Sequence, residues 1–335
     1  MDGTGASRIC QPAGDELESP ALPPLPPWRV AEQYPMTRKI QIHQVDAFTL
    51  ERFTGNPAGV VLHADGLTDT QMLAIARELN NADTAFIFAA DGADHDVRAR
   101  FFTPRTEAGF VGHATVAAHH VLSALPNAPK RLRQKSKAGV VEIEVRGSGE
   151  DRKIAVRQKT PPIGRELNDR ERLAVLDALA LATDDLDTRC PLRIAGASST
   201  RLLIGVRGVE ALTHLKPDMA RLTTLSAQIG AAGYFVFALT PAHEHHLSEA
   251  RMFCPALGIA EDPVSGNAHG LLGVYLVQNG LLAHDRHHAS FRGVQGRWLH
   301  RTGQVEVELE MAGGTVSGVW IIGQAVSVFQ TEMMF

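Results

Sequence analysis

Two stretches of the sequence join acidic residues to a glycine that opens an apolar run, and both have the same layout. The first runs from Ala99 to Pro104 and continues through Glu107 to Gly112-His113-Ala114. The second runs from Ala250 to Pro255 and continues from Glu261 to Ala268. A helix that begins at a glycine presents unpaired N–H groups and a partial positive charge. Two such helix starts could clamp a carboxylate or stabilise an enolate-like oxygen.

Other segments repeat in the same order and support an internal duplication. Residues 86–89 match residues 235–238, and residues 141–145 match residues 305–309. The offset between the copies rises from 149 (86 to 235) to 164 (141 to 305), as loop insertions would make it. The repeated unit is a whole domain, too long for a solenoid repeat. The two glycine-led helix starts are therefore expected to face one another between two related domains.

Asp83 is the acid that breaks this symmetry. It stands just before an expected strand, and the matching position of the second copy is Ala232. A carboxyl group shielded at a domain interface has a raised pKa, so it can take and return a proton near neutral pH. The alternative for Asp83 is a structural one, the capping of a turn.

His113 and Asp262 are the other candidates for proton transfer or for hydrogen bonds to a substrate. His113 directly follows the first helix-start glycine, and Asp262 lies four residues before Gly266. Each has a plainer alternative, because His113 could be a structural histidine and Asp262, next to Pro263, a turn former. Gly112 and Gly266 could likewise be only tight turns before core helices.

Hydrophobic periodicity predicts the elements that would position these residues. Helices are expected at 67–79, 112–122, 219–229 and 266–277, and the second and fourth are apolar on all sides, which is typical of buried helices. This pattern predicts an α+β fold with a strongly curved sheet around each central helix. Strands are expected at residues 40–48, 60–62, 84–88, 97–102, 139–145, 153–157, 192–194, 202–206, 234–239, 304–311 and 319–328.

The chain divides into a leader and two domains. Residues 1–36 are rich in proline and are expected to be a disordered leader, with Met36 as a candidate functional start. The first domain is expected at 37–160 and the second at 173–330, with the final strand as a candidate to pack back on the first domain. Pro161-Pro162 marks the linker between them.

Composition excludes several classes of function. A net charge of −4 provides no basic stripe for nucleic acid, and no apolar run approaches the roughly 18 residues that span a membrane. Three cysteines without a C-x-x-C spacing predict a reducing, cytoplasmic environment. The sequence lacks a Walker motif and the G-x-G-x-x-G motif of dinucleotide binding, so no cofactor is expected. The histidines at 243–246 and 284–288 lack a further ligand at metal-site spacing.

Several motifs occur in a fixed order along the chain. They are Asp46-Ala47-Phe48, Gly55-Asn56-Pro57-Ala58, Ala82-Asp83-Thr84-Ala85-Phe86, Phe102-Thr103-Pro104, Gly112-His113-Ala114-Thr115 and Glu261-Asp262-Pro263-Val264-Ser265-Gly266. Together they resemble the phenazine-biosynthesis PhzF-like family, over about residues 38–330. The resemblance implies the diaminopimelate-epimerase-like fold, with two similar barrel-like domains each around a helix, often as a homodimer.

The resemblance also implies a chemistry. The phenazine enzyme isomerises a dihydro-hydroxyanthranilate by an acid-base proton shift, with a glutamate at the position of Asp83 here, a histidine at His113 and an aspartate at Asp262. This sequence departs from that pattern at Asp83, which is shorter by one methylene, and at Asn267, where the family has a serine. Because a shift of about 1 Å can cost much rate, a different substrate is expected.

Related racemases place a thiol before each helix-start glycine, whereas this chain has Val111 and Ser265 there, which argues against two-thiol racemisation. The sequence therefore predicts a cofactor-independent isomerase that moves a proton on a small cyclic carboxylate in the interdomain cleft. The alternative is a catalytically idle homologue that binds a metabolite or a protein there. The expected site residues are catalytic Asp83, His113 and Asp262 and substrate-binding Gly112, Ser265, Gly266 and Asn267.

Overall fold

The fold is built from two copies of one strand pattern. The computed structural model describes residues 1, 39–197, 199–241 and 244–334. The expected leader, with its candidate start Met36, falls at residues 2–38, outside the described part of the chain apart from Met1. Among the described residues, no helix has both the length and the apolar character needed to cross a membrane.

The first copy, called lobe 1, curves around helix α2 (Gly112–Leu122). Its strands run in the order β18, β1, β2, β3, β4, β6, β7, β8, and β5 pairs with β4. Helix α1 (Asp69–Leu79) packs on its outer side against β3 and β4. The strands are β1 (Lys39–Ala47), β2 (Asn56–Val61), β3 (Asp83–Ala89), β4 (Val97–Phe102), β5 (Glu107–Ala108), β6 (Arg131–Ser136), β7 (Gly139–Arg146), β8 (Lys153–Gln158) and β18 (Ala325–Met334).

The second copy, called lobe 2, curves around helix α6 (Gly266–Gln278) in the same way. Its strand order is β9, β10, β11, β12, β13, β15, β16, β17, and β14 pairs with β13. The strands are β9 (Ile163–Glu166), β10 (Arg193–Ala195), β11 (Arg201–Val206), β12 (Tyr234–Leu239), β13 (Ser248–Cys254), β14 (Ile259–Asp262), β15 (His288–Gln295), β16 (Gly303–Ala312) and β17 (Thr315–Gly323). Its outer helices are α3 (Asp169–Leu179), α4 (Val209–His214) and α5 (Met219–Ile229).

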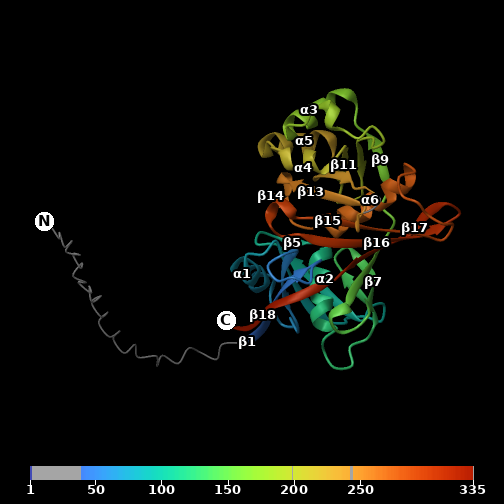
Figure 1. The fold of residues 1–335 in the computed structure, drawn as a ribbon. Coiled ribbons are helices and arrows are strands. Elements are labelled where there is room, and N and C mark those ends of the chain that lie inside the picture. The colour runs from blue at the N-terminus through green and yellow to red at the C-terminus, as the bar shows by residue number, and fades with distance from the viewer. Residues whose placement is uncertain (2–38, 198, 242–243, 335) are drawn as a thin grey trace. The chain divides into compact units, whose positions relative to one another are not determined.

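The two strand orders match position by position, which confirms the duplication inferred from the sequence. The pair β2–β3 is parallel, like β11–β12, and β4–β6 is parallel, like β13–β15. Pairing of β8 with β17 joins the copies into one sheet of 18 strands. Lobe 1 lies below and lobe 2 above in Figure 1, with β16 and β17 running between them. The expected α+β fold, with a curved sheet around each of two helices, is confirmed.

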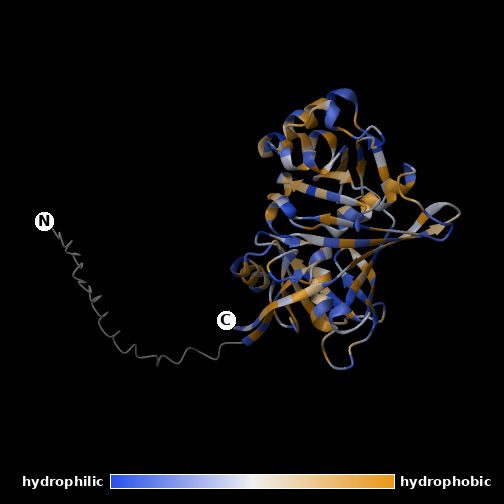
Figure 2. Cartoon of the chain, viewed as in Figure 1, coloured by the Kyte–Doolittle hydropathy of each residue, from blue (hydrophilic) through white to orange (hydrophobic). Residues whose placement is uncertain are grey.

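Both central helices are buried because they are built from small and apolar residues. In α2, every residue from His113 to His119 is buried, and in α6 all but Asn267 and the last two residues are. The sheets instead alternate, as in β16, where Val305, Val307 and Leu309 face inward between outward glutamates. Figure 2 shows this alternation as orange and blue residues along the strands.

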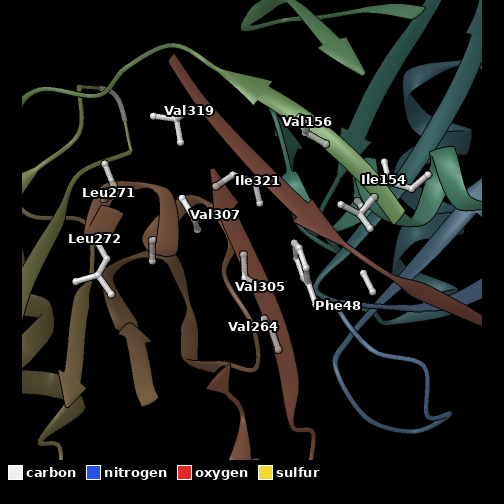
Figure 3. Close-up of a cluster of buried hydrophobic side chains, with 14 of the residues drawn as sticks. Phe48, Ile154, Val156, Val264, Leu271, Leu272, Val305, Val307, Val319 and Ile321 are labelled. Carbon is white, nitrogen blue, oxygen red and sulfur yellow. The ribbon is translucent and has the colours of Figure 1, made fainter. Parts of the chain in front are cut away.

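One hydrophobic cluster extends through both lobes and includes α2 and α6. Phe48, in the loop between β1 and β2, belongs to this cluster and is 1% exposed. It lies against Gly266 at the start of α6 and against Gly323 at the end of β17. Figure 3 shows the shared core, with side chains from the two lobes meeting around β16 and β17. The start of α6 is thus held by a residue of lobe 1.

Several elements were not expected from the sequence, among them strands β6, β13 and β15 and helix α4. Two further segments also differ from the expectation. Residues 319–328 do not form one strand, because the chain leaves β17 at Gln324 and pairs onward with β1 as β18. The Gln324 carbonyl accepts a hydrogen bond from the Phe48 amide at 2.7 Å at this crossing between lobes. Residues 161–172, expected as a linker, contain β9 and the first turn of α3, which begins with a capping box between Asn168 and Glu171. The short β9 is mostly exposed and has no apolar alternation, so periodicity could not reveal it.

Candidate functional site

The starts of α2 and α6 form the frame of the candidate site. The two helices contact each other across the lobes. At α2, the N-cap Val111 supplies no side-chain hydrogen bond, so the amides of Gly112, His113 and Ala114 have no partner within the described part of the chain. At α6, the Ser265 hydroxyl accepts a hydrogen bond from the Ala268 amide at 3.3 Å. The amides of Gly266 and Asn267 have no partner among the described residues. Unpaired helix-start amides carry partial positive charge and suit an anionic group.

Asp83 lies at the first position of β3, where the strand begins beside β2. The residue is 7% exposed, and its Oδ1 atom is buried without a hydrogen-bond partner among the described residues. Burial, together with the nearby charge of Asp262, raises the pKa of Asp83 to about 7. Near neutral pH this carboxyl group is therefore close to half protonated, the condition in which one group serves as both acid and base.

His113 is the nearest ionisable neighbour of Asp83. Its Nε2 atom lies 3.8 Å from Asp83 Oδ2, which is within ion-pair range but too long for a hydrogen bond. Burial lowers the pKa of His113 to about 4, so the imidazole is neutral at pH 7 and the contact is not an ion pair there. Its Nε2 is also buried without a partner within the described residues. A neutral imidazole in this place can exchange a proton with a substrate or hydrogen-bond to it.

Asp262 comes from the other lobe, at the end of β14 just before α6. Burial raises its pKa to about 6, while the Arg201 cation and a hydrogen bond from Asn56 act in the opposite direction. Asn56 Nδ2 donates to Asp262 Oδ1 at 2.7 Å. Each lobe thus supplies one acid with a raised pKa, and the two acids are close enough to influence one another's titration.

Ser265 and Asn267 are placed differently from one another. Ser265 uses its hydroxyl as the α6 cap, and its backbone amide donates to Gln295 Oε1 at 3.0 Å. Ser265 therefore has a structural task, and its amide is not available to a ligand. Asn267 is partly exposed, and its Nδ2 donor has no partner among the described residues, so it remains able to bind one.

The candidate site includes three residues that were not predicted as site residues from the sequence. Asn56 and Gln295 hold Asp262 and the turn that follows it, and Arg201 is a buried cation beside it. Asn56 belongs to the Gly55-Asn56-Pro57-Ala58 motif, so the sequence motif could have identified it as a site residue. Gln295 ends β15 and Arg201 begins the buried strand β11, and neither belongs to a local motif, so only their tertiary neighbours reveal them.

Some features of the described residues lie away from this site. Cavities of about 360 and 400 Å³ open elsewhere, the first beside His246 and Arg292 and the second between α1 and Met333. Asp83 and His113 line neither of them. No group of histidine, cysteine and acidic side chains among the described residues is arranged to hold a metal ion.

The two helix-start glycines are expected to respond differently to alanine. A methyl group on Gly112 would meet nothing within 4 Å, whereas one on Gly266 would lie 2.7 Å from Ile321 Cγ2 and 2.9 Å from Phe48 Cζ. Gly266→Ala should therefore lower the free energy of unfolding by about 1–3 kcal/mol. Gly112→Ala should fold as stably as wild type but weaken ligand binding by about tenfold or more, because its methyl group points into open space at the site. Urea denaturation with binding measurements would separate the two, and an equally large loss of stability in both would contradict this geometry.

Comparison with known proteins agrees with this fold. The PhzC-PhzF profile, described as "Phenazine biosynthesis-like protein", matches residues 45–331. An "Uncharacterized isomerase" of Clostridium acetobutylicum is 40% identical over 300 residues, covering 89% of this chain and 99% of that protein. A phenazine biosynthesis protein of the PhzF family from Bacillus anthracis has a TM-score of 0.79 and 28% identity, covering 89% of this chain and all of that structure. A hydroxyproline epimerase from Agrobacterium vitis, at 11% identity and a TM-score of 0.58, covers 89% of this chain and 93% of that structure and shares the fold alone. The protein described here belongs to the PhzC-PhzF phenazine biosynthesis-like family and has the diaminopimelate-epimerase-like fold.

Proposed function

We propose that this protein is a cofactor-independent isomerase that moves a proton between two carbon atoms of a small, cyclic, carboxylate-bearing metabolite bound between the lobes. The observation that carries the proposal is the buried Asp83 carboxyl, whose pKa of about 7 suits reversible proton transfer, beside two helix starts with unpaired amides. The names of the relatives, which are isomerases, support the reaction class.

The proposed step is a proton shift along a conjugated system. The Asp83 carboxylate removes a proton from a ring carbon, and the electron pair of that C–H bond moves into the conjugated carboxylate to give an enolate-like anion. The helix-start amides at Gly112 and Gly266 stabilise the charge that develops on its oxygen atoms. The protonated Asp83 then returns the proton to a second carbon, so that the product is an isomer and the enzyme is regenerated. His113 and Asp262, with Asn267, orient the substrate.

The absence of pseudo-symmetry in the side chains supports a one-base reaction. Asp83 of lobe 1 corresponds to Ala232 of lobe 2, and His113 corresponds to Asn267. A two-base racemase needs a matched group on each side of the substrate, and here the N-cap positions of the two central helices are Val111 and Ser265 rather than thiols. We accordingly propose transfer by one carboxylic acid and not two-thiol racemisation.

A screen in deuterated water tests the function with several classes of carboxylate at once. The purified protein would be incubated in D2O with a panel of cyclic mono- and dicarboxylates, unsaturated and saturated, and with proline as a racemase control. Isomerisation would be followed by ¹H NMR and deuterium uptake by mass spectrometry. We expect an unsaturated cyclic carboxylate to isomerise with little or partial deuterium uptake, because a single buried base can return the same proton. Exchange only at the α-carbon of proline would contradict the proposal, and binding without exchange across the panel would favour an idle homologue that acts as a binding module.

A further inference from the structure

Asn56 is a lobe 1 residue whose side chain hydrogen-bonds only to lobe 2 within the described residues. It is the first residue of β2 and is fully buried. Its Nδ2 atom donates to Asp262 Oδ1 at 2.7 Å and to the Val264 carbonyl at 2.8 Å. The orientation of the carboxamide follows from these partners, since a carboxylate and a carbonyl oxygen both require a donor. The bonds join residues 206 and 208 positions apart in the sequence.

The loop before Asn56 is itself fixed to lobe 2. Arg301 donates through Nη2 to Asp46 Oδ1 at 2.6 Å and through Nε to the Gly55 carbonyl at 3.0 Å. The Gly55 amide donates to the Thr302 carbonyl at 3.1 Å. Gly55 has φ +62°, and a Cβ atom there would lie 2.3 Å from the Ala47 carbonyl oxygen, so only glycine fits. The position of the Asn56 carboxamide is therefore set by contacts from both lobes.

The turn that carries Asp262 is held from the opposite side by Gln295. Its Nε2 atom donates to the Asp262 carbonyl at 2.6 Å, and its Oε1 accepts from the Ser265 amide at 3.0 Å. This bracket fixes the backbone of the turn but does not contact the Asp262 carboxylate, which accepts hydrogen bonds from the Val264 amide and from Asn56. The hydrogen bond from Asn56 supplies the constraint on the carboxylate that Gln295 does not.

We infer that Asn56 is a positioning residue through which lobe 1 orients the Asp262 carboxylate of lobe 2 and, beside the Arg201 cation, favours its ionised form. The inference rests on the proposed function for its catalytic consequence, but the hydrogen bond and its effect on Asp262 can be measured without a substrate. A donor to the charged form of a carboxyl group favours that form. Since the charge of Asp262 also raises the pKa of Asp83, Asn56 influences the catalytic acid through Asp262.

A titration of the wild-type protein tests the contact directly. The carboxyl carbon of Asp262, observed by ¹³C NMR in protein labelled at aspartate, should titrate with a midpoint near 6. The ¹⁵N and ¹H signals of the Asn56 side-chain amide should shift with the same midpoint. Asn279 is a matched control, because its Nδ2 also donates to a carbonyl, that of Tyr275 at 2.8 Å, at the far end of α6. Its signals should not follow the Asp262 midpoint.

Two variants extend the test. Asn56→Ala removes the donor, and Asn56→Asp preserves the shape while placing a second carboxyl group beside Asp262. Both should raise the midpoint of Asp262 above the wild-type value, and Asn56→Asp should raise it more. With an isomerisable substrate, each should lower kcat by about tenfold to a hundredfold and move the acidic limb of its pH profile upward, whereas Asn279→Ala should leave both unchanged. The inference is overturned if the titration midpoint of Asp262 is unchanged in the variants. It is also overturned if the side-chain amide signals of Asn56 in the wild-type protein do not shift as Asp262 titrates. Failure of the substrate screen alone would affect the proposed function and not this result.

Discussion

Asp83→Asn is expected to lower the turnover of an isomerisable substrate by about 10²–10⁴-fold, the range typical for loss of a general acid-base residue. Asparagine has nearly the same shape as aspartate but can neither take up nor release a proton near neutral pH. The amides at the starts of α2 and α6 and the side chains of His113 and Asp262 remain in place, so substrate binding should change much less than kcat. Steady-state kinetics with direct binding measurements would show whether the loss falls on kcat.

A control for this result is Asp96→Asn in the same lobe. Asp96 is an exposed residue that accepts hydrogen bonds from the Arg133 backbone and side chain, away from the helix starts. Its replacement should leave turnover within about twofold of wild type, as expected for a surface change outside the site. Wild-type turnover in the Asp83→Asn variant would show that another group transfers the proton.

The Asp83→Asn substitution is also expected to stabilise the protein at pH 8. A native pKa of about 7, raised from 3.8, means that the folded state holds a proton that the unfolded state releases. Asp83 therefore has no effect on the free energy of unfolding below about pH 4, and it destabilises the fold progressively as the pH rises from about 4 to about 7. At pH 8 the cost is about 2–4 kcal/mol, so Asp83→Asn should gain about that amount there and nothing at pH 4. Urea denaturation of both proteins across this range would measure the difference.

Asp285 provides a control of opposite sign. The amides of His287 and His288 donate to its carboxylate, and these hydrogen bonds lower its pKa. A lowered native pKa contributes stability above the unfolded pKa and loses it as the pH falls. Asp285→Asn should therefore destabilise the protein at pH 8 and become neutral at low pH. A gain of stability at pH 8 in both variants would point to net charge rather than to the environment of Asp83. If Asp83→Asn is active and no more stable than wild type, the carboxyl group is not desolvated as described.

The loss of turnover and the gain of stability expected for Asp83→Asn have one physical cause. The burial that makes Asp83 a competent acid-base group also makes it costly to ionise in the folded state. Loss of activity together with gain of stability is the behaviour expected where a fold retains a destabilising group for its chemistry. The pair of measurements therefore distinguishes a catalytic role from a turn-capping role, since removal of a capping aspartate costs stability rather than adding it.

The sequence by itself determined the two central helices, many of the strands around them and the order in which these elements repeat. Small and apolar residues marked α2 and α6 as buried helices, glycine marked their starts, and the repeated motifs indicated two related halves; each of these features is local or periodic, so it can be recognised without a partner. Asp83 was found in the same way, as an acid whose counterpart in the other copy is Ala232. The crossing of the last strand at Gln324 and the mostly exposed β9 gave no local signal, and strands β6, β13 and β15 were not recognised either.

The tertiary structure alone decided how the candidate site is held. Asn56 meets Asp262 across 206 residues of sequence, and Arg201 and Gln295 approach the same turn from other strands. It also showed that the Ser265 hydroxyl accepts the capping hydrogen bond of α6. A hydrogen bond depends on distance and direction between two groups, and a pKa depends on everything that surrounds the carboxyl group. Neither property belongs to a residue type or to its spacing along the chain, so both emerge only when the two lobes pack together.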